Sequence, residues 1–127
     1  MIDLDVIEVR HGAIATVRIG PNEDLVEGVC KAVAKAGFQR ALVRSGLGSL
    51  IDASIDNGLG STCEVAGPAI EILALSGVIC LGPESPAAEL TAILGTTRGR
   101  VIAGKLVPGR NPVCVTAEIV IEELFSV

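Results

Sequence analysis

Apolar and polar residues alternate in two short runs between residues 89 and 107, and a glycine-containing break separates the runs. A three-residue hairpin loop favours glycine at its third position, where the backbone is left-handed, and Gly99 stands there. Centring the loop on Arg98 predicts an antiparallel hairpin in which Thr91 lies opposite Lys105. The whole fold prediction starts from this hairpin.

Because side chains alternate between the two faces of a strand, this register divides the hairpin into two faces. One face is apolar and is predicted to be core: Leu90, Ala92, Leu94, Ile102 and Leu106. The other face holds Glu89, Thr91, Ile93, Val101, Ala103 and Lys105. Its polar members, Glu89, Thr91 and Lys105, meet at the open end of the hairpin. These three are the main candidate ligand-binding residues.

One helix is predicted, over about residues 22–37. Asn22 is the expected N-cap, acidic residues follow in the first turn, and Gly37 is the expected end. The expected buried stripe has helical spacing and consists of Leu25, Val26, Val29, Cys30 and Val33. Glu27, Lys31 and Lys35 step by four residues along the opposite side.

The rest of the chain predicts strands joined by short turns. The expected strands are 2–9, 13–19, 40–44, 50–55, 62–66, 70–81 and 113–121, besides the hairpin. His11-Gly12 separates the first two, and the glycines of 45–49 are expected to form a bend or a bulge that lets backbones approach. Residues 70–81 are the longest apolar run and predict a central strand buried on both faces. The predicted class is α+β: a single compact domain over residues 1–127, mostly antiparallel sheet with one main helix.

Composition restricts the function. Half of the 127 residues are hydrophobic, Trp and Tyr are absent, and the net charge is −5. An acidic chain without stacking aromatics is unsuited to bind nucleic acid by itself. Arg98-Gly99-Arg100 resembles an AT-hook core, but Val101 stands where that motif needs proline. The mean hydropathy of +0.61 predicts surface hidden in an oligomer, because no apolar run is long enough for a membrane span.

The four cysteines are widely spaced, without a Cys-x-x-Cys motif. The chain opens with Asp3 and Asp5 instead of a basic and then apolar stretch, so we expect no export signal and a cytoplasmic protein. Its thiols are then expected to be reduced and mostly buried.

Several readings of the polar candidates stay open. The Glu89, Thr91 and Lys105 group can be a surface salt bridge, a pocket for a small anion or the remnant of a metal site. His11, the only histidine, is expected to be a turn residue, or else a ligand or interface group. Glu71 and Glu118 lie in apolar strands, where each carboxylate needs a basic partner or a catalytic role. They are secondary candidates, as is His11.

Five segments in order resemble a known family. They are Gly20-Pro21-Asn22-Glu23-Asp24-Leu25, Ser45-Gly46-Leu47-Gly48-Ser49-Leu50, Gly67-Pro68-Ala69-Ile70-Glu71-Ile72-Leu73-Ala74-Leu75-Ser76-Gly77, Ala103-Gly104-Lys105-Leu106 and Thr116-Ala117-Glu118-Ile119-Val120-Ile121. Together, from about Thr16 to Leu124, they resemble the PPC (plants and prokaryotes conserved) domain. The resemblance implies a homotrimer of α+β fold, with a sheet topology shared with acetolactate decarboxylase.

The chain departs from the family at the predicted hairpin. Stand-alone prokaryotic members usually carry His-x-His in its first strand and Gly-Gly-His in its second, a set suited to zinc. Here these places read Glu89-Leu90-Thr91 and Ala103-Gly104-Lys105. A protonated lysine cannot ligate a metal, so the sequence predicts no metal and no cofactor.

The leading hypothesis is therefore a cytoplasmic, metal-free PPC-like homotrimer without autonomous DNA binding. It would act as a binding or regulatory module for protein partners or for a small anionic ligand at Lys105. One alternative is an enzyme on a small carboxylate (decarboxylase, lyase or tautomerase), with Lys105 as the cation or acid and Glu89 as the base. The other is a DNA-associated regulator.

Overall fold

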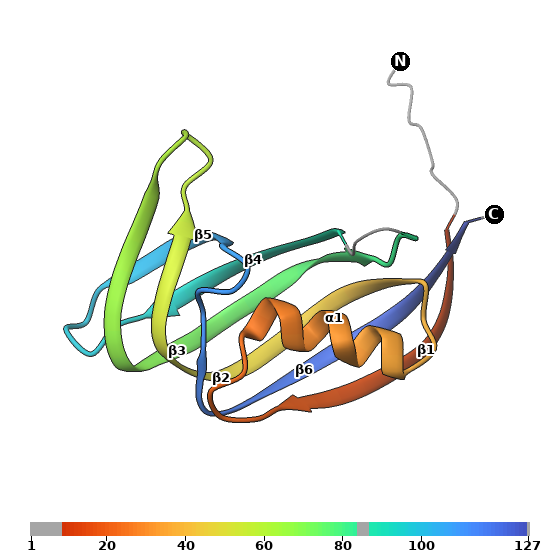
Figure 1. Ribbon diagram of the computed structural model, residues 1–127, viewed down its shortest axis with the longest axis horizontal. Helices are drawn as coiled ribbons and strands as arrows, with labels where there is room; N and C mark the ends of the chain where they lie inside the picture. Colours follow the sequence, from red (N-terminus) through yellow and green to blue (C-terminus); the bar gives the residue numbers. More distant parts are fainter. Residues whose placement is uncertain (1–8, 84–86, 127) are drawn as a thin grey trace, which may run out of the picture.

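The computed structural model describes residues 9–83 and 87–126 and forms one six-stranded antiparallel sheet with one helix (Figure 1). The elements are β1 (Val9–Ile19), α1 (Leu25–Lys35), β2 (Arg40–Asp56), β3 (Thr62–Cys80), β4 (Ala87–Gly95), β5 (Val101–Leu106) and β6 (Val113–Ser126). The strand order is β1-β6-β2-β3-β4-β5. The predicted α+β class, with a mostly antiparallel sheet and one helix, is confirmed.

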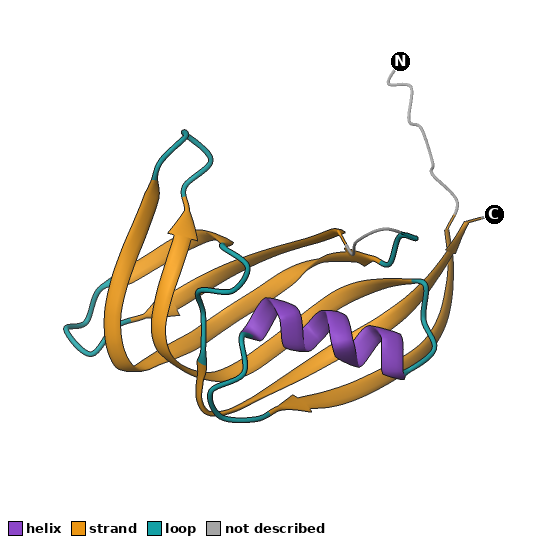
Figure 2. Cartoon of the chain, in the orientation of Figure 1, coloured by secondary structure: helices purple, strands orange, loops and turns teal. Residues whose placement is uncertain are grey.

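The helix covers one face of the sheet and leaves the other bare (Figure 2). Its apolar stripe, with Leu25, Val29 and Val33 fully buried, joins the inward side chains of the strands in one core. We call the sheet face under α1 the inner face and the opposite one the outer face. A side chain on the outer face is covered only by its neighbours in the sheet, which makes this the face available for binding.

Strand β2 changes its pairing partners along its length. The first half of β2 pairs with β6 and β3, whereas its last residues pair with β3 and β5. The pairing of Asp56 with Lys105 therefore joins β5 back to β2 and closes β2, β3, β4 and β5 into a ring. This closure protects the edge of β5, which would otherwise be an open template for pairing.

The predicted hairpin is confirmed in register and in facing. Thr91 pairs with Lys105 and Leu94 with Ile102, and Gly99 has a φ of +76°. Leu90, Ala92, Leu94 and Leu106 are buried, and Ile102 is half-buried against the core. A local turn signal was sufficient here because the two strands are consecutive in the chain.

The helix is shorter than predicted, and its N-cap is Asp24 instead of Asn22. The Asp24 carboxylate accepts from the Glu27 backbone N–H at 3.0 Å, while Asn22 has a φ of +68° in the preceding turn. Asp24 also accepts from the Asn111 backbone N–H at 2.8 Å, so the cap ties α1 to the loop before β6. Gly37, with a φ of +82°, follows the C-cap Ala36 close to the predicted end.

The predicted breaks at His11-Gly12 and Gly67-Pro68 are wrong, and the bend or bulge predicted at 45–49 is a bulge, because all three segments are bulged but continuous strands. His11-Gly12 lies within β1, the glycines of 45–49 lie within β2, and Gly67-Pro68 lies within β3. Gly48 gives the physical reason for the second: at its φ of +143°, a Cβ would lie 2.3 Å from the Thr116 backbone oxygen. Glycine here lets β2 and β6 approach instead of ending a strand. The predicted strand at 2–9 falls almost wholly outside the described residues.

The prediction that residues 70–81 are buried on both faces is wrong. Their side chains alternate between a buried and an exposed face. Leu75 is 3% exposed on the inner face, whereas Leu73 is 56% exposed on the outer face. The long apolar run therefore reflects an uncovered apolar surface of the chain instead of a doubly buried strand.

Candidate functional site

The Glu89, Thr91 and Lys105 group forms as predicted, on the outer face. Lys105 Nζ lies 3.5 Å from Glu89 Oε1, diagonally across the hairpin, and both side chains are more than half exposed. Thr91 is exposed beside them. The group is thus an open ion pair on a strand surface, an arrangement that can contact a ligand but does not enclose one.

A polar row continues from this group across the sheet. Thr91 pairs with Ser76 on β3. The register that pairs Val43 with Gly77 brings Arg44 beside Ser76, and both line one shallow depression. Strand neighbours lie about 4.8 Å apart, so Lys105, Thr91, Ser76 and Arg44 cross four strands of the outer face in roughly 15 Å.

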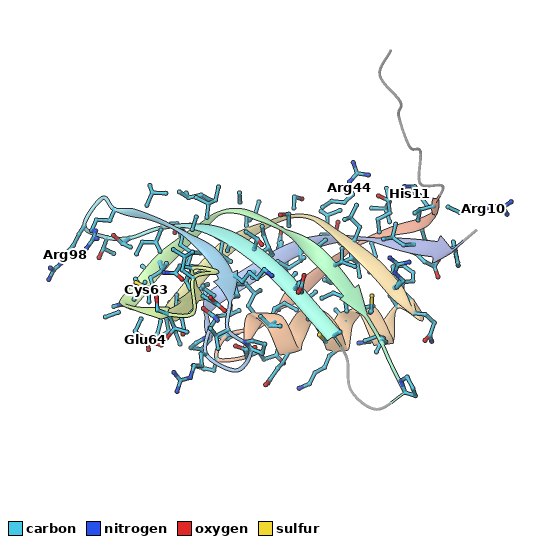
Figure 3. The ribbon with its side chains drawn as sticks, turned by 90° about the horizontal axis from the view of Figure 1, so that it is seen from above. Arg10, His11, Arg44, Cys63, Glu64 and Arg98 are labelled. Atoms are coloured by element: carbon cyan, nitrogen blue, oxygen red, sulfur yellow. The ribbon has the colours of Figure 1, made fainter. Side chains whose placement is uncertain are left out.

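The row ends in a charge cluster that the sequence did not predict. Glu122 of β6 accepts a hydrogen bond of 2.8 Å from Arg44 Nη1 through one carboxylate oxygen, and its other oxygen lies 2.8 Å from His11 Nδ1. The Glu122 side chain is 7% exposed, while those of His11 and Arg44 are about half exposed. Figure 3 shows Arg44 and His11 on the side of the sheet opposite α1. His11 is therefore an ion-pairing strand residue, not the turn residue that was expected.

The secondary acidic candidates do not join either group. Glu118 is half-exposed on β6 and pairs with Arg18 of β1 at 2.8 Å, the basic partner that was expected. Glu71 is exposed on the outer face of β3, so its carboxylate does not lie in the apolar core. The core covers only the inner face of β3, so the Glu71 carboxylate on the outer face stays in water.

Large apolar side chains occupy the outer face beside the polar row. Leu47, Leu73, Ile93 and Val101, from four adjacent strands, are 63%, 56%, 40% and 66% exposed. We call these four residues the outer apolar band. A contiguous exposed surface of this kind marks an interaction site in a folded protein.

The cysteines are free, and Cys63 on β3 is exposed, contrary to the expectation of mostly buried thiols. Burial raises the pKa of the Cys30 thiol, and the nearby carboxylates of Asp24 and Glu27 raise it further. A thiol so shifted is a weak nucleophile at neutral pH. Within residues 9–83 and 87–126, no three His, Cys, Asp or Glu side chains gather as a metal site would need. No helix of this part of the chain is long and apolar enough to cross a membrane.

Solved structures share this fold over almost the whole chain. A PPC protein from Pyrococcus horikoshii superposes with a TM-score of 0.83 at 23% identity, covering 98% of this chain and 87% of that one. A metal-containing protein from Archaeoglobus fulgidus gives 0.78 at 25% identity, covering 97% and 87%. A proposed DNA-binding protein from Bacteroides thetaiotaomicron gives 0.70 at 16%, covering 91% and 83%. None of the curated proteins compared matches this chain.

The sequence profile of one family matches residues 7–125, nearly the whole length of the chain. Its description is the Plants and Prokaryotes Conserved (PCC) domain, the family that the five ordered segments resemble. The profile covers the helix, β1 to β5 and all but the last residue of β6, and the Pyrococcus protein of the same type has the same architecture. The chain therefore belongs to the Plants and Prokaryotes Conserved domain family.

Proposed function

We propose that this chain is a self-associating binding module, a homotrimer that acts on protein partners or on a small anion rather than through metal-dependent chemistry. The outer apolar band is the observation that carries the proposal. Four large side chains on adjacent strands stand uncovered, on a chain whose opposite sheet face is covered by its own helix. Burying such a band between copies stabilises an oligomer by the hydrophobic effect.

The open Lys105–Glu89 pair supports binding over catalysis. A catalytic lysine is usually desolvated so that it can lose its proton, and Lys105 is 54% exposed and faces a carboxylate. In this position it can give one charge-assisted hydrogen bond to an anion of a ligand or of a partner's side chain. The enzyme alternative would need a pocket that closes over Lys105 when a substrate binds.

The chain is expected not to shift duplex DNA at about 150 mM salt, because phosphate backbones repel a net charge of −5. The Bacteroides relative is a proposed DNA-binding protein, but at 16% identity it supports the fold alone. An electrophoretic shift series with micromolar protein checks this expectation. Sub-micromolar binding at that salt would favour the DNA-associated regulator instead.

Untagged protein is expected to contain far less than one zinc per chain by elemental analysis. A zinc site needs three or four deprotonated ligands, and the ammonium of Lys105 would repel the ion at the hairpin. The metal-containing Archaeoglobus relative makes this a sharp comparison within one fold. Stoichiometric zinc that disappears in Glu89→Gln or His11→Asn would contradict the metal-free proposal and revive the enzyme.

A further inference from the structure

The His11, Arg44 and Glu122 cluster is arranged like a binding site, because its central carboxylate contacts the two basic side chains of the cluster and fixes them in place. Both oxygens of Glu122 are occupied, one by each basic side chain, and the carboxylate is almost fully buried by them. The carboxylate thus fixes the orientation of the guanidinium and the imidazole, as partners of ligating side chains do. Such preorganisation lowers the entropic cost of ordering these side chains when a ligand binds.

Donors remain on the exposed side of the cluster. Arg44 donates to Glu122 through Nη1, and the other N–H donors of its guanidinium remain for a ligand. His11 Nδ1 lies against Glu122, so Nε2 is the ring nitrogen left for a ligand, and it donates to an anion only when the imidazole carries both protons. Ser76 adds a hydroxyl to the same depression of about 590 Å³, whose remaining lining is Leu42 and Val43. Polar donors at the rim and an apolar floor match a ligand with one charged end and a short hydrocarbon part.

The charge of the cluster selects an anion. Glu122 neutralises Arg44, and any proton on His11 then makes the group net positive within a chain of charge −5. Each oxygen of Glu122 already faces a basic side chain, so the carboxylate has little charge left to attract a cation. A planar carboxylate fits the fork geometry of a guanidinium better than a spherical anion does.

We propose that the depression beside His11 and Arg44 binds a small carboxylate with a short aliphatic chain. The carboxylate accepts hydrogen bonds from the free side of Arg44, from the Ser76 hydroxyl and, when the imidazole carries both protons, from His11 Nε2. Its hydrocarbon part lies on Leu42. This site is separate from the Lys105 pair of the proposed function and does not depend on it.

The test uses His11 as a reporter, because the chain has a single histidine. The imidazole resonances of untagged, nitrogen-15-labelled protein are followed by NMR during titration with butyrate at about pH 6, within the range where histidines gain charge. Butyramide, which has the same shape without the charge, is the matched ligand control. We expect saturable shifts with a dissociation constant on the order of millimolar for butyrate, and no saturable shift for butyramide.

Two arginine variants locate the effect. Arg44→Gln is expected to weaken butyrate binding about tenfold or more, the size of a lost charge-assisted bond. Arg18→Gln is the matched control, because Arg18 makes an ion pair of the same length, also to a β6 glutamate, away from the depression. It should bind as the unchanged protein does. Circular dichroism and a urea midpoint establish that both variants are folded, and His11→Asn read by calorimetry gives a second loss-of-binding variant.

Each other outcome overturns the inference. An equal response to butyramide removes the charge requirement, and unchanged binding by Arg44→Gln removes the site. If Lys105→Gln abolishes binding while Arg44→Gln retains it, the anion belongs at Lys105; the proposed function then stands and this inference fails. No saturable response up to about 50 mM butyrate excludes a site of useful affinity.

Discussion

Replacing Asn111 with alanine is expected to lower the free energy of unfolding by about 2–4 kcal/mol. The Asn111 side chain is fully buried in the loop between β5 and β6. Its oxygen accepts from the Ser54 backbone N–H at 2.9 Å, and its amide donates to the carbonyl oxygens of Val107 at 2.8 Å and Ser54 at 3.3 Å. Alanine leaves these three backbone groups without this partner, and the two groups of Ser54, which are buried, bear the largest desolvation cost.

Urea unfolding followed by circular dichroism measures the effect at one fixed protein concentration, since self-association would add to the apparent stability. Asn57→Ala is the matched control. Asn57 also makes side-chain hydrogen bonds, with Ser61 and the Leu59 backbone, but in an exposed turn where water replaces them. The control is expected to cost less than about 1 kcal/mol. Equal losses in the two variants would mean that Asn111 does not hold the β5–β6 loop against β2.

Leu73→Glu is expected to convert the proposed trimer into monomers at micromolar concentration. Leu73 is 56% exposed in the middle of the outer apolar band, and its side chain is the nearest to Gly95 on the neighbouring strand. A carboxylate there must be desolvated at the interface, and symmetry brings its copies toward one another. Light scattering coupled to size exclusion gives the mass directly.

Leu59→Glu is the control for that variant, because Leu59 is 88% exposed in the β2–β3 turn, away from the band. It should keep the mass of the unchanged protein. Val101→Glu tests a second position of the band. If the unchanged protein is a trimer and both band variants remain trimers, the interface lies elsewhere. A monomeric unchanged protein would contradict the oligomeric proposal itself.

The sequence predicted best where contacts are local. Gly99 and the alternation around it fixed the pairing of Thr91 with Lys105, because the two strands are joined by one short turn. At Gly48 the expected close approach of backbones is present, but the sequence could not name its partner, because Thr116 lies on a strand nearly seventy residues later. Propensity alone could not separate these two uses of glycine.

The same limit explains the missed cluster. Glu122 meets Arg44 from a strand 78 positions away, and only the order β1-β6-β2 brings His11 to its other side. No local pattern encodes that order. One signal was present: Glu118 and Glu122 are both at outward positions of an otherwise apolar strand, and such positions face basic residues on the neighbouring strands.

The pairing of β1 with β6 has a practical consequence for protein engineering. Val9 lies opposite Ser126 and His11 opposite Leu124, so the two described ends of the chain leave the sheet side by side (Figure 1). A domain joined directly to Val9 or to Ser126 would start next to the same corner, which is also the corner of the His11 depression. An affinity tag of histidines would bring foreign imidazoles to the one place where a single imidazole is the reporter. A circular permutant could join the same ends with a short linker and open the chain at the β2–β3 turn, far from that corner.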